Sequence, residues 1–86
     1  MPTLRFHSWS RRALENDIKP GNRYRRHFAS LVATATVLDL RPDLSGIAHV
    51  HFAIAIEGSA AGRSANLGTR ILALRSFADT YRERIP

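Results

Sequence analysis

The chain has 86 residues and 44% of them are hydrophobic, so the sequence encodes one small folded domain rather than several domains or a disordered chain. It contains no cysteine, which excludes a disulfide framework and a thiolate metal site. Thirteen Lys and Arg residues against seven Asp and Glu residues give a net charge of +6, and this excess favours a polyanionic partner.

The sequence contains no signal that predicts insertion into a membrane. The N-terminal stretch MPTLRFHSWSRR lacks the apolar core of a secretory signal, and no apolar run approaches the ~20 residues of a membrane-spanning helix. The lack of cysteine also fits a reducing compartment. We therefore expect a cytoplasmic protein without membrane contact.

The N-terminal region predicts one strand and one short helix. Residues 2–9 alternate between apolar and polar side chains, which is the period of a half-buried strand. Ser8 or Ser10 can then cap a helix over residues 11–18, which ends at the Lys-Pro-Gly-Asn sequence that follows. The sequence leaves open whether all of residues 1–22 are ordered.

The middle of the chain predicts two strands. Residues 23–40 are rich in Val, Thr, Leu and aromatic residues and contain no Gly or Pro, which indicates one long strand. Its better core face is the one that carries Ala29, Leu31, Ala33, Ala35 and Val37. After the turn sequence at 41–46, the alternating sequence of residues 47–57 indicates a second strand, and the two should pair as an antiparallel hairpin.

Strand 47–57 has two different faces. One face carries the large apolar side chains Val50, Phe52, Ile54 and Ile56. The other carries His49, His51, Ala53 and Ala55. This second face is smaller and more polar, so we expect it to be less buried and able to carry the N-terminal segment, a second copy of the chain or a ligand.

The C-terminal region predicts a loop and a long helix. Gly58–Gly62 is a loop of small residues, and residues 67–85 read as an amphipathic helix with apolar residues spaced four and three apart. Its apolar stripe consists of Leu67, Ile71, Leu74, Ala78, Tyr81 and Ile85. The predicted fold is therefore α+β, in β(α)ββα order. A small antiparallel sheet of about three strands carries the C-terminal helix on one face, in a single domain over residues 1–86.

A basic and aromatic cluster in the first third of the chain is the strongest candidate for binding. Up to His27 the chain carries seven basic and two acidic side chains, so most of the excess charge lies there. Arginine next to aromatic residues suits phosphate contact combined with base stacking, and it also suits an acidic protein surface. The candidate binding residues are Arg11, Arg12, Arg23, Tyr24, Arg25 and Arg26.

A second candidate is an anion site in the sequence GSAAGRS. It resembles a phosphate-binding loop, although it has three residues between its glycines and Arg63 in place of Lys. Nucleotide hydrolysis is not expected, because it requires a parallel sheet and a longer chain. Gly62, Arg63 and Ser64 can instead hold one phosphate or carboxylate where the last helix begins, or the loop can be a simple connector.

The histidines are the third candidate. His49 and His51 project from the same face of their strand at a spacing that a metal can bridge, and His27 lies on the neighbouring predicted strand. No acidic or cysteine ligand accompanies them, so we predict no metal. No nucleophile elbow, zinc-protease motif or placed carboxylate pair is present, and we expect no enzyme activity and no cofactor.

Two resemblances bear on function. The predicted order of strand, strand and helix over residues 23–85 resembles double-stranded-RNA-binding folds, whose final helix carries basic residues toward the phosphate backbone. The size, the lack of catalytic motifs and the single domain are similar to small inhibitors encoded by phages or mobile elements, anti-CRISPR proteins among them. The latter is a likeness of type that assigns no residue.

The sequence thus supports two hypotheses. In the first, the chain is a non-enzymatic binding module that docks on nucleic acid or on a nucleoprotein complex. In the second, it is an inhibitor or a homodimeric adaptor that binds the acidic surface of another protein through a sheet face or an edge strand.

Overall fold

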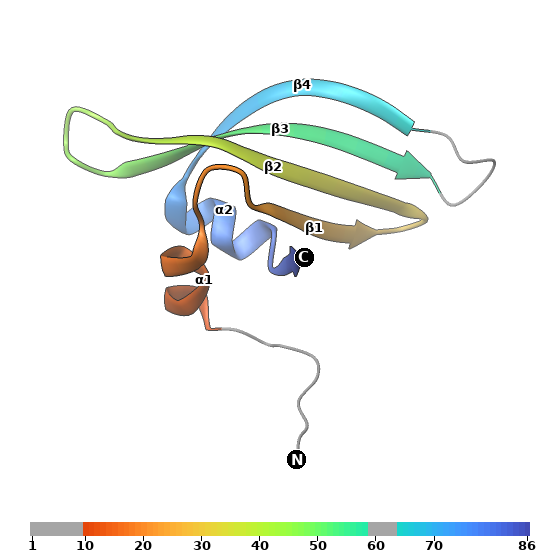
Figure 1. Cartoon of the computed structure of the whole chain (residues 1–86), viewed down its shortest axis with the longest axis horizontal. Helices are drawn as coiled ribbons and strands as arrows, with labels where there is room; N and C mark the ends of the chain where they lie inside the picture. Colours follow the sequence, from red (N-terminus) through yellow and green to blue (C-terminus); the bar gives the residue numbers. More distant parts are fainter. Residues whose placement is uncertain (1–9, 59–63) are drawn as a thin grey trace, which may run out of the picture.

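The computed structural model describes residues 10–58 and 64–86, which form a five-stranded antiparallel sheet with two short helices (Figure 1). The elements are α1 (Arg11–Asp17), β1 (Arg23–Phe28), β2 (Leu31–Pro42), β3 (Ala48–Gly58), β4 (Ser64–Ala73), α2 (Leu74–Thr80) and β5 (Glu83–Ile85). The strands lie in the order β4-β3-β2-β1-β5. Four strands follow one another as a meander, and α2 then carries the chain back beneath the sheet so that β5 pairs with β1.

The predicted sheet of about three strands with one C-terminal helix is therefore wrong, although the α+β character remains. One error lies in residues 23–40, which form a hairpin and not one long strand. Phe28 pairs with Leu31 across a turn at Ala29 and Ser30. Ala29 has a φ of 52°, a conformation that Gly or Asn usually supplies in a tight hairpin. The turn thus lacks its usual sequence signal.

The second error is the helix predicted for residues 67–85. Most of its first half belongs to β4, which pairs with β3 along its length. Leu67 and Gly68 form a bulge opposite Ile54, and Gly68 has a φ of 81°. Pairing with β3 satisfies the backbone of this segment, and its Gly-Thr sequence is a poor helix former. Only seven residues remain helical in α2.

Other predictions are confirmed. The helix at 11–18 is α1, and the side chain of Ser10 caps it by accepting a hydrogen bond from the N–H of Ala13 at 3.2 Å. The hairpin of β2 and β3 is present, with Val50 and Phe52 buried as expected. The strand predicted at 2–9 and most of the loop at 58–62 lie outside the described residues.

Aromatic side chains attach the helices to one face of the sheet. Phe77 of α2 lies between Tyr24 of β1 and Phe52 of β3, with ring centroids 5.7 and 4.9 Å away in edge-on geometry. Tyr81, which follows α2, packs on Phe52 at 5.6 Å. Leu14 of α1 joins the same buried cluster. Within the described part of the chain, neither helix is long and apolar enough to cross a membrane.

The sheet therefore has two unlike faces. We call the face that carries α1 and α2, together with these helices, the helix side. We call the opposite face the open face, since no described helix covers it (Figure 1). By register the open face carries Arg23, Arg25 and His27 of β1, Val32, Thr34, Thr36, Asp39 and Arg41 of β2, His49, His51, Ala53, Ala55 and Glu57 of β3, Ser64, Asn66, Thr69, Ile71 and Ala73 of β4, and Glu83 and Ile85 of β5.

Candidate functional site

The alternation of β1 divides the arginine cluster that the sequence suggested. Arg23 and Arg25 project from the open face, whereas Arg26 lies opposite buried Ala33 on the helix side. Tyr24 points into the core and is fully buried. Because Arg11 and Arg12 belong to α1, the six predicted binding residues do not form one surface.

Tyr24 has a structural role and is not accessible for base stacking. Its hydroxyl donates to Oδ2 of Asp17 at 2.8 Å, and burial raises the pKa of Tyr24 to about 12. Arg84 of β5 donates to the other carboxylate oxygen of Asp17 at 2.8 Å, and its guanidinium also reaches Asn22 at 3.3 Å. This network links α1, β1 and β5.

The arginines of the open face are largely paired with carboxylates. Arg25 donates to Glu83 at 2.9 Å, and this bond holds the pKa of the Glu83 carboxyl below its usual value. Arg41 donates to Asp39 at 2.7 Å. With Arg23 and Glu57 included, the described open face has three arginines and three carboxylates, so its charge is balanced.

The helix side keeps arginines that no carboxylate neutralises. Of the described arginines on this side, Arg12, Arg26, Arg70 and Arg75 have no ion pair with a described carboxylate. Arg11 differs from them, since it lies 3.6 Å from Glu15 and 3.5 Å from Asp79. An uncompensated guanidinium in water is available to an external phosphate or carboxylate.

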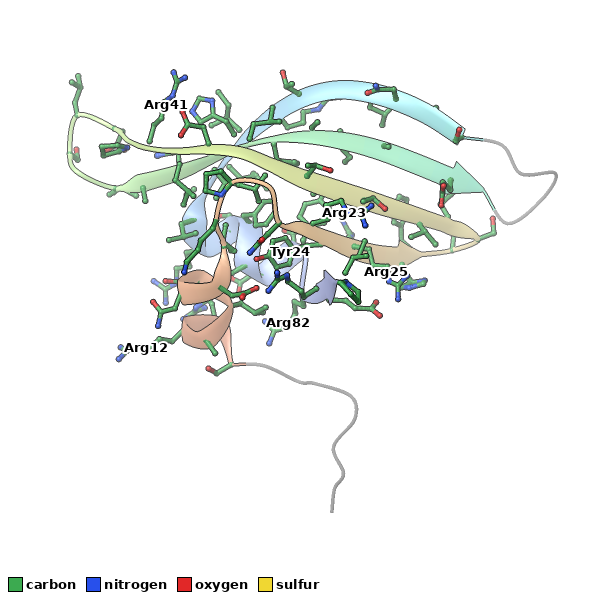
Figure 2. The ribbon with its side chains drawn as sticks, in the orientation of Figure 1. Arg12, Arg23, Tyr24, Arg25, Arg41 and Arg82 are labelled. Atoms are coloured by element: carbon green, nitrogen blue, oxygen red, sulfur yellow. The ribbon has the colours of Figure 1, made fainter. Side chains whose placement is uncertain are left out.

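Two of these arginines line the same hollow between α1 and α2. Arg12 and Arg75, with Arg11 and Glu15, line an open hollow of about 450 Å³. Figure 2 shows Arg12 projecting from α1 away from the sheet. Arg75 lies in the first turn of α2, so this pair marks the beginning of that helix.

The other two lie near the end of the same helix. Arg26 of β1 stands 5.2 Å from the ring centroid of Phe28. Arg70 lies opposite buried Phe52 and donates to the carbonyl of Leu67 at 2.8 Å. Burial raises the pKa of Tyr81, which follows α2, and the positive charges of Arg26 and Arg70 oppose this rise. Arg12 and Arg75 thus line one hollow, whereas Arg26 and Arg70 lie on β1 and β4, with β2 and β3 between them.

The predicted anion site does not have the expected context. Gly62 and Arg63 lie outside the described residues, and Ser64 begins strand β4 rather than a helix. The arrangement of strand, loop and helix that a phosphate-binding loop requires is therefore not found, because a strand follows this loop.

The histidines do not come together. His27 lies beside Glu83, with its Nε2 at 3.4 Å from the carboxylate, near one edge of the sheet. His49 and His51 lie on β3, in the part of this strand that pairs with the last residues of β2. In this register His51 lies opposite Asp39. Among residues 10–58 and 64–86, no group of three or more His, Asp or Glu side chains could hold a metal ion.

Comparison with known proteins does not identify the chain: no protein-family model, no curated protein and no solved structure matches it. The order of elements behind the resemblance to double-stranded-RNA-binding folds is also not found, since β4 occupies part of the expected final helix.

Sequence reasoning did not single out Arg70 and Arg75 as candidate residues, because it placed both on the solvent face of one long helix. The sequence SANLGTRILA does carry a signal, since Gly and Thr interrupt its helical pattern. Recognising a strand there would have separated Arg70 from Arg75. It would not have shown which arginines lack a carboxylate.

Proposed function

We propose that the chain is a non-enzymatic, cytoplasmic binding module that holds the phosphate backbone of a nucleic acid, free or in a nucleoprotein complex, on the helix side of its sheet. The observation that supports this proposal is the uneven distribution of charge. Among the described residues, four arginines of the helix side have no ion pair with a carboxylate, while the open face has equal numbers of arginines and carboxylates.

The spacing of the arginines suits a polymer better than a small anion. Arg12 and Arg75 lie at the beginning of α2, and Arg26 and Arg70 lie near Tyr81 at its end. A seven-residue helix is about 10 Å long, which corresponds to roughly three nucleotides of one strand in duplex DNA. Guanidinium groups match phosphate geometry, so Arg12 and Arg75 can engage one phosphate or two neighbouring phosphates, while Arg26 and Arg70, on β1 and β4, would each engage a separate one.

The test is fluorescence anisotropy with labelled duplex and single-stranded oligonucleotides across a salt series. Four phosphate contacts predict a slope of log K against log salt of about −3.6 on duplex DNA and about −2.8 on a single strand. Absence of binding to all of these oligonucleotides at low salt would contradict the proposal. An acidic protein would then become the expected partner of the same surface.

A matched pair of variants locates the binding surface. R12Q/R75Q removes two charges from the helix side, and R23Q/R41Q removes two from the open face. The first variant should bind more weakly, with a slope shallower by about 1.8 on duplex DNA, because two phosphate contacts are lost. The second should bind nearly as the wild type does. The reverse result would assign binding to the open face.

A further inference from the structure

Among residues 10–58 and 64–86, no helix or strand covers the open face of the sheet (Figure 1). Its centre consists of short side chains, namely those of Thr34, Thr36, Ala53, Ala55 and Thr69. Ile71 on the same face is 58% exposed, and Leu38, the extra residue of the β2 bulge, is 50% exposed. Short side chains allow a second sheet to approach to the ~10 Å spacing of packed sheets.

Charge determines which partner fits this face. The open face carries three arginines and three carboxylates, whereas the helix side, including α1, α2 and Arg84 of β5, carries six arginines against three carboxylates among the described residues. Two helix sides would repel each other. Two open faces are neutral, and each has both charges to offer to the other.

We propose that the open face is a homodimer interface, on which a second copy of the chain packs its own open face. The interface is isologous, as twofold symmetry requires. Glu57, which has no ion pair within the described part of the chain, provides a carboxylate for Arg23 of the other copy at the rim of the interface.

The area of the open face is sufficient for a specific interface between two copies. Four strands about 4.8 Å apart and about nine residues of roughly 3.4 Å give a patch of about 20 Å by 30 Å. Each copy therefore contributes about 600 Å². The total of about 1,200 Å² reaches the lower end of stable, specific interfaces.

This dimer goes beyond the proposed function and does not depend on it. Packing through the open faces leaves both helix sides, with their unpaired arginines, on the outside of the assembly. A dimer would therefore present two separate basic surfaces, and two weak contacts on one polyanion strengthen each other.

The experiment is sedimentation equilibrium of the full chain from about 1 µM to 1 mM, with Ala53→Glu and Ala65→Glu as a matched pair. Ala53 lies between Thr36 and Thr69 on the open face, whereas exposed Ala65 lies on the helix side of the edge strand β4. Both variants lower the net charge equally, so a difference between them reports the position of the new carboxylate.

The wild type should approach twice its mass of 9.6 kDa at high concentration. Ala65→Glu should dimerise as the wild type does, and Ala53→Glu should dimerise at least tenfold more weakly, because it buries unpaired charge. Ile71→Glu, at a half-exposed position, replaces Ala53→Glu should the latter fail to fold. A wild-type monomer throughout this range, or a dimer that neither open-face variant weakens, would overturn the proposal.

Discussion

The two faces of the sheet use similar residues for different purposes. On the helix side, buried aromatic rings hold α2 in place, and Arg12, Arg26, Arg70 and Arg75 have no ion pair with a described carboxylate. On the open face, the side chains are short and the charges form pairs such as Arg25 with Glu83. Neighbouring residues of one strand therefore belong to surfaces with different properties. Consecutive arginines in a sequence form one binding surface only if the strand that carries them projects them to the same face.

The difference between the faces depends on α2. Phe77 attaches this helix to the sheet, Arg75 of the helix lines a hollow with Arg12, and Tyr81 at its end feels the charges of Arg26 and Arg70. Four of the following predictions test the two faces separately through stability, and a final one tests them through binding.

The largest effect is expected from removal of the Phe77 ring. Phe77 is fully buried and contacts the rings of Tyr24 and Phe52. Phe77→Ala should lower the free energy of unfolding by about 3–5 kcal/mol, a large part of the total for a domain of this size. Urea denaturation measures the loss. Leu44→Ala, at a fully exposed turn position, is the control and should change stability by less than about 0.5 kcal/mol.

A smaller effect is expected from the Tyr24 hydroxyl, which joins β1 to α1 through Asp17. Tyr24→Phe should cost about 1–2 kcal/mol, because it removes a hydrogen bond to a charged acceptor. Tyr81→Phe is the matched control, since the Tyr81 hydroxyl has no hydrogen bond within the described part of the chain and its loss should cost little. Equal losses in both variants would contradict the role given to the Asp17 network.

The raised pKa of Tyr24 predicts that the stability of the fold depends on pH in the alkaline range. The folded chain keeps the Tyr24 proton to a pKa of about 12, against an ordinary value of 10.0. Unfolding therefore releases this proton between these two values, so the Tyr24 contribution to stability is complete below pH 10 and declines toward pH 12. Stability measured over this range should fall more steeply for the wild type than for Tyr24→Phe.

The smallest effect is expected on the open face. Glu83→Gln removes the carboxylate that pairs with Arg25, and because this pair is about half exposed, the loss should be about 0.2–1 kcal/mol. The pKa of Glu83 is lowered on folding, so its contribution is present above its unfolded pKa and disappears as the pH falls through the folded value. Denaturation at neutral and acidic pH should show a difference between variant and wild type only at neutral pH.

The sequence predicts best the elements whose signals are local. The alternation from His49 to Glu57 identifies β3 and its core face, and Ser10 identifies the beginning of α1. The turn at Ala29 is not predicted from the sequence, because an alanine takes the positive φ that Gly or Asn usually supplies. The helix prediction for residues 67–85 is wrong because apolar spacings of four and three suit a helix, while the pairing of 64–73 with β3 is a non-local interaction that these spacings do not reveal.

The candidate site was less accessible to sequence reasoning than the fold. The basic character of the chain is evident from composition, but which arginines remain unpaired depends on distant residues. Arg25 meets a carboxylate 58 residues away, and Arg84 meets one 67 residues away. Arg26 has no such partner, although it directly follows Arg25 in the sequence. Strand register decides this difference.

The most direct test of the account compares Arg25→Gln and Arg26→Gln in nucleic-acid binding by anisotropy across a salt series. The two variants have the same change in charge at adjacent positions of β1, but on opposite faces. The account predicts that Arg26→Gln weakens binding and makes the salt slope shallower by about 0.9 on duplex DNA, the value for one phosphate, while Arg25→Gln leaves both nearly unchanged. Weakening by Arg25→Gln alone, or equal weakening by both, would contradict the claim that binding belongs to the helix side.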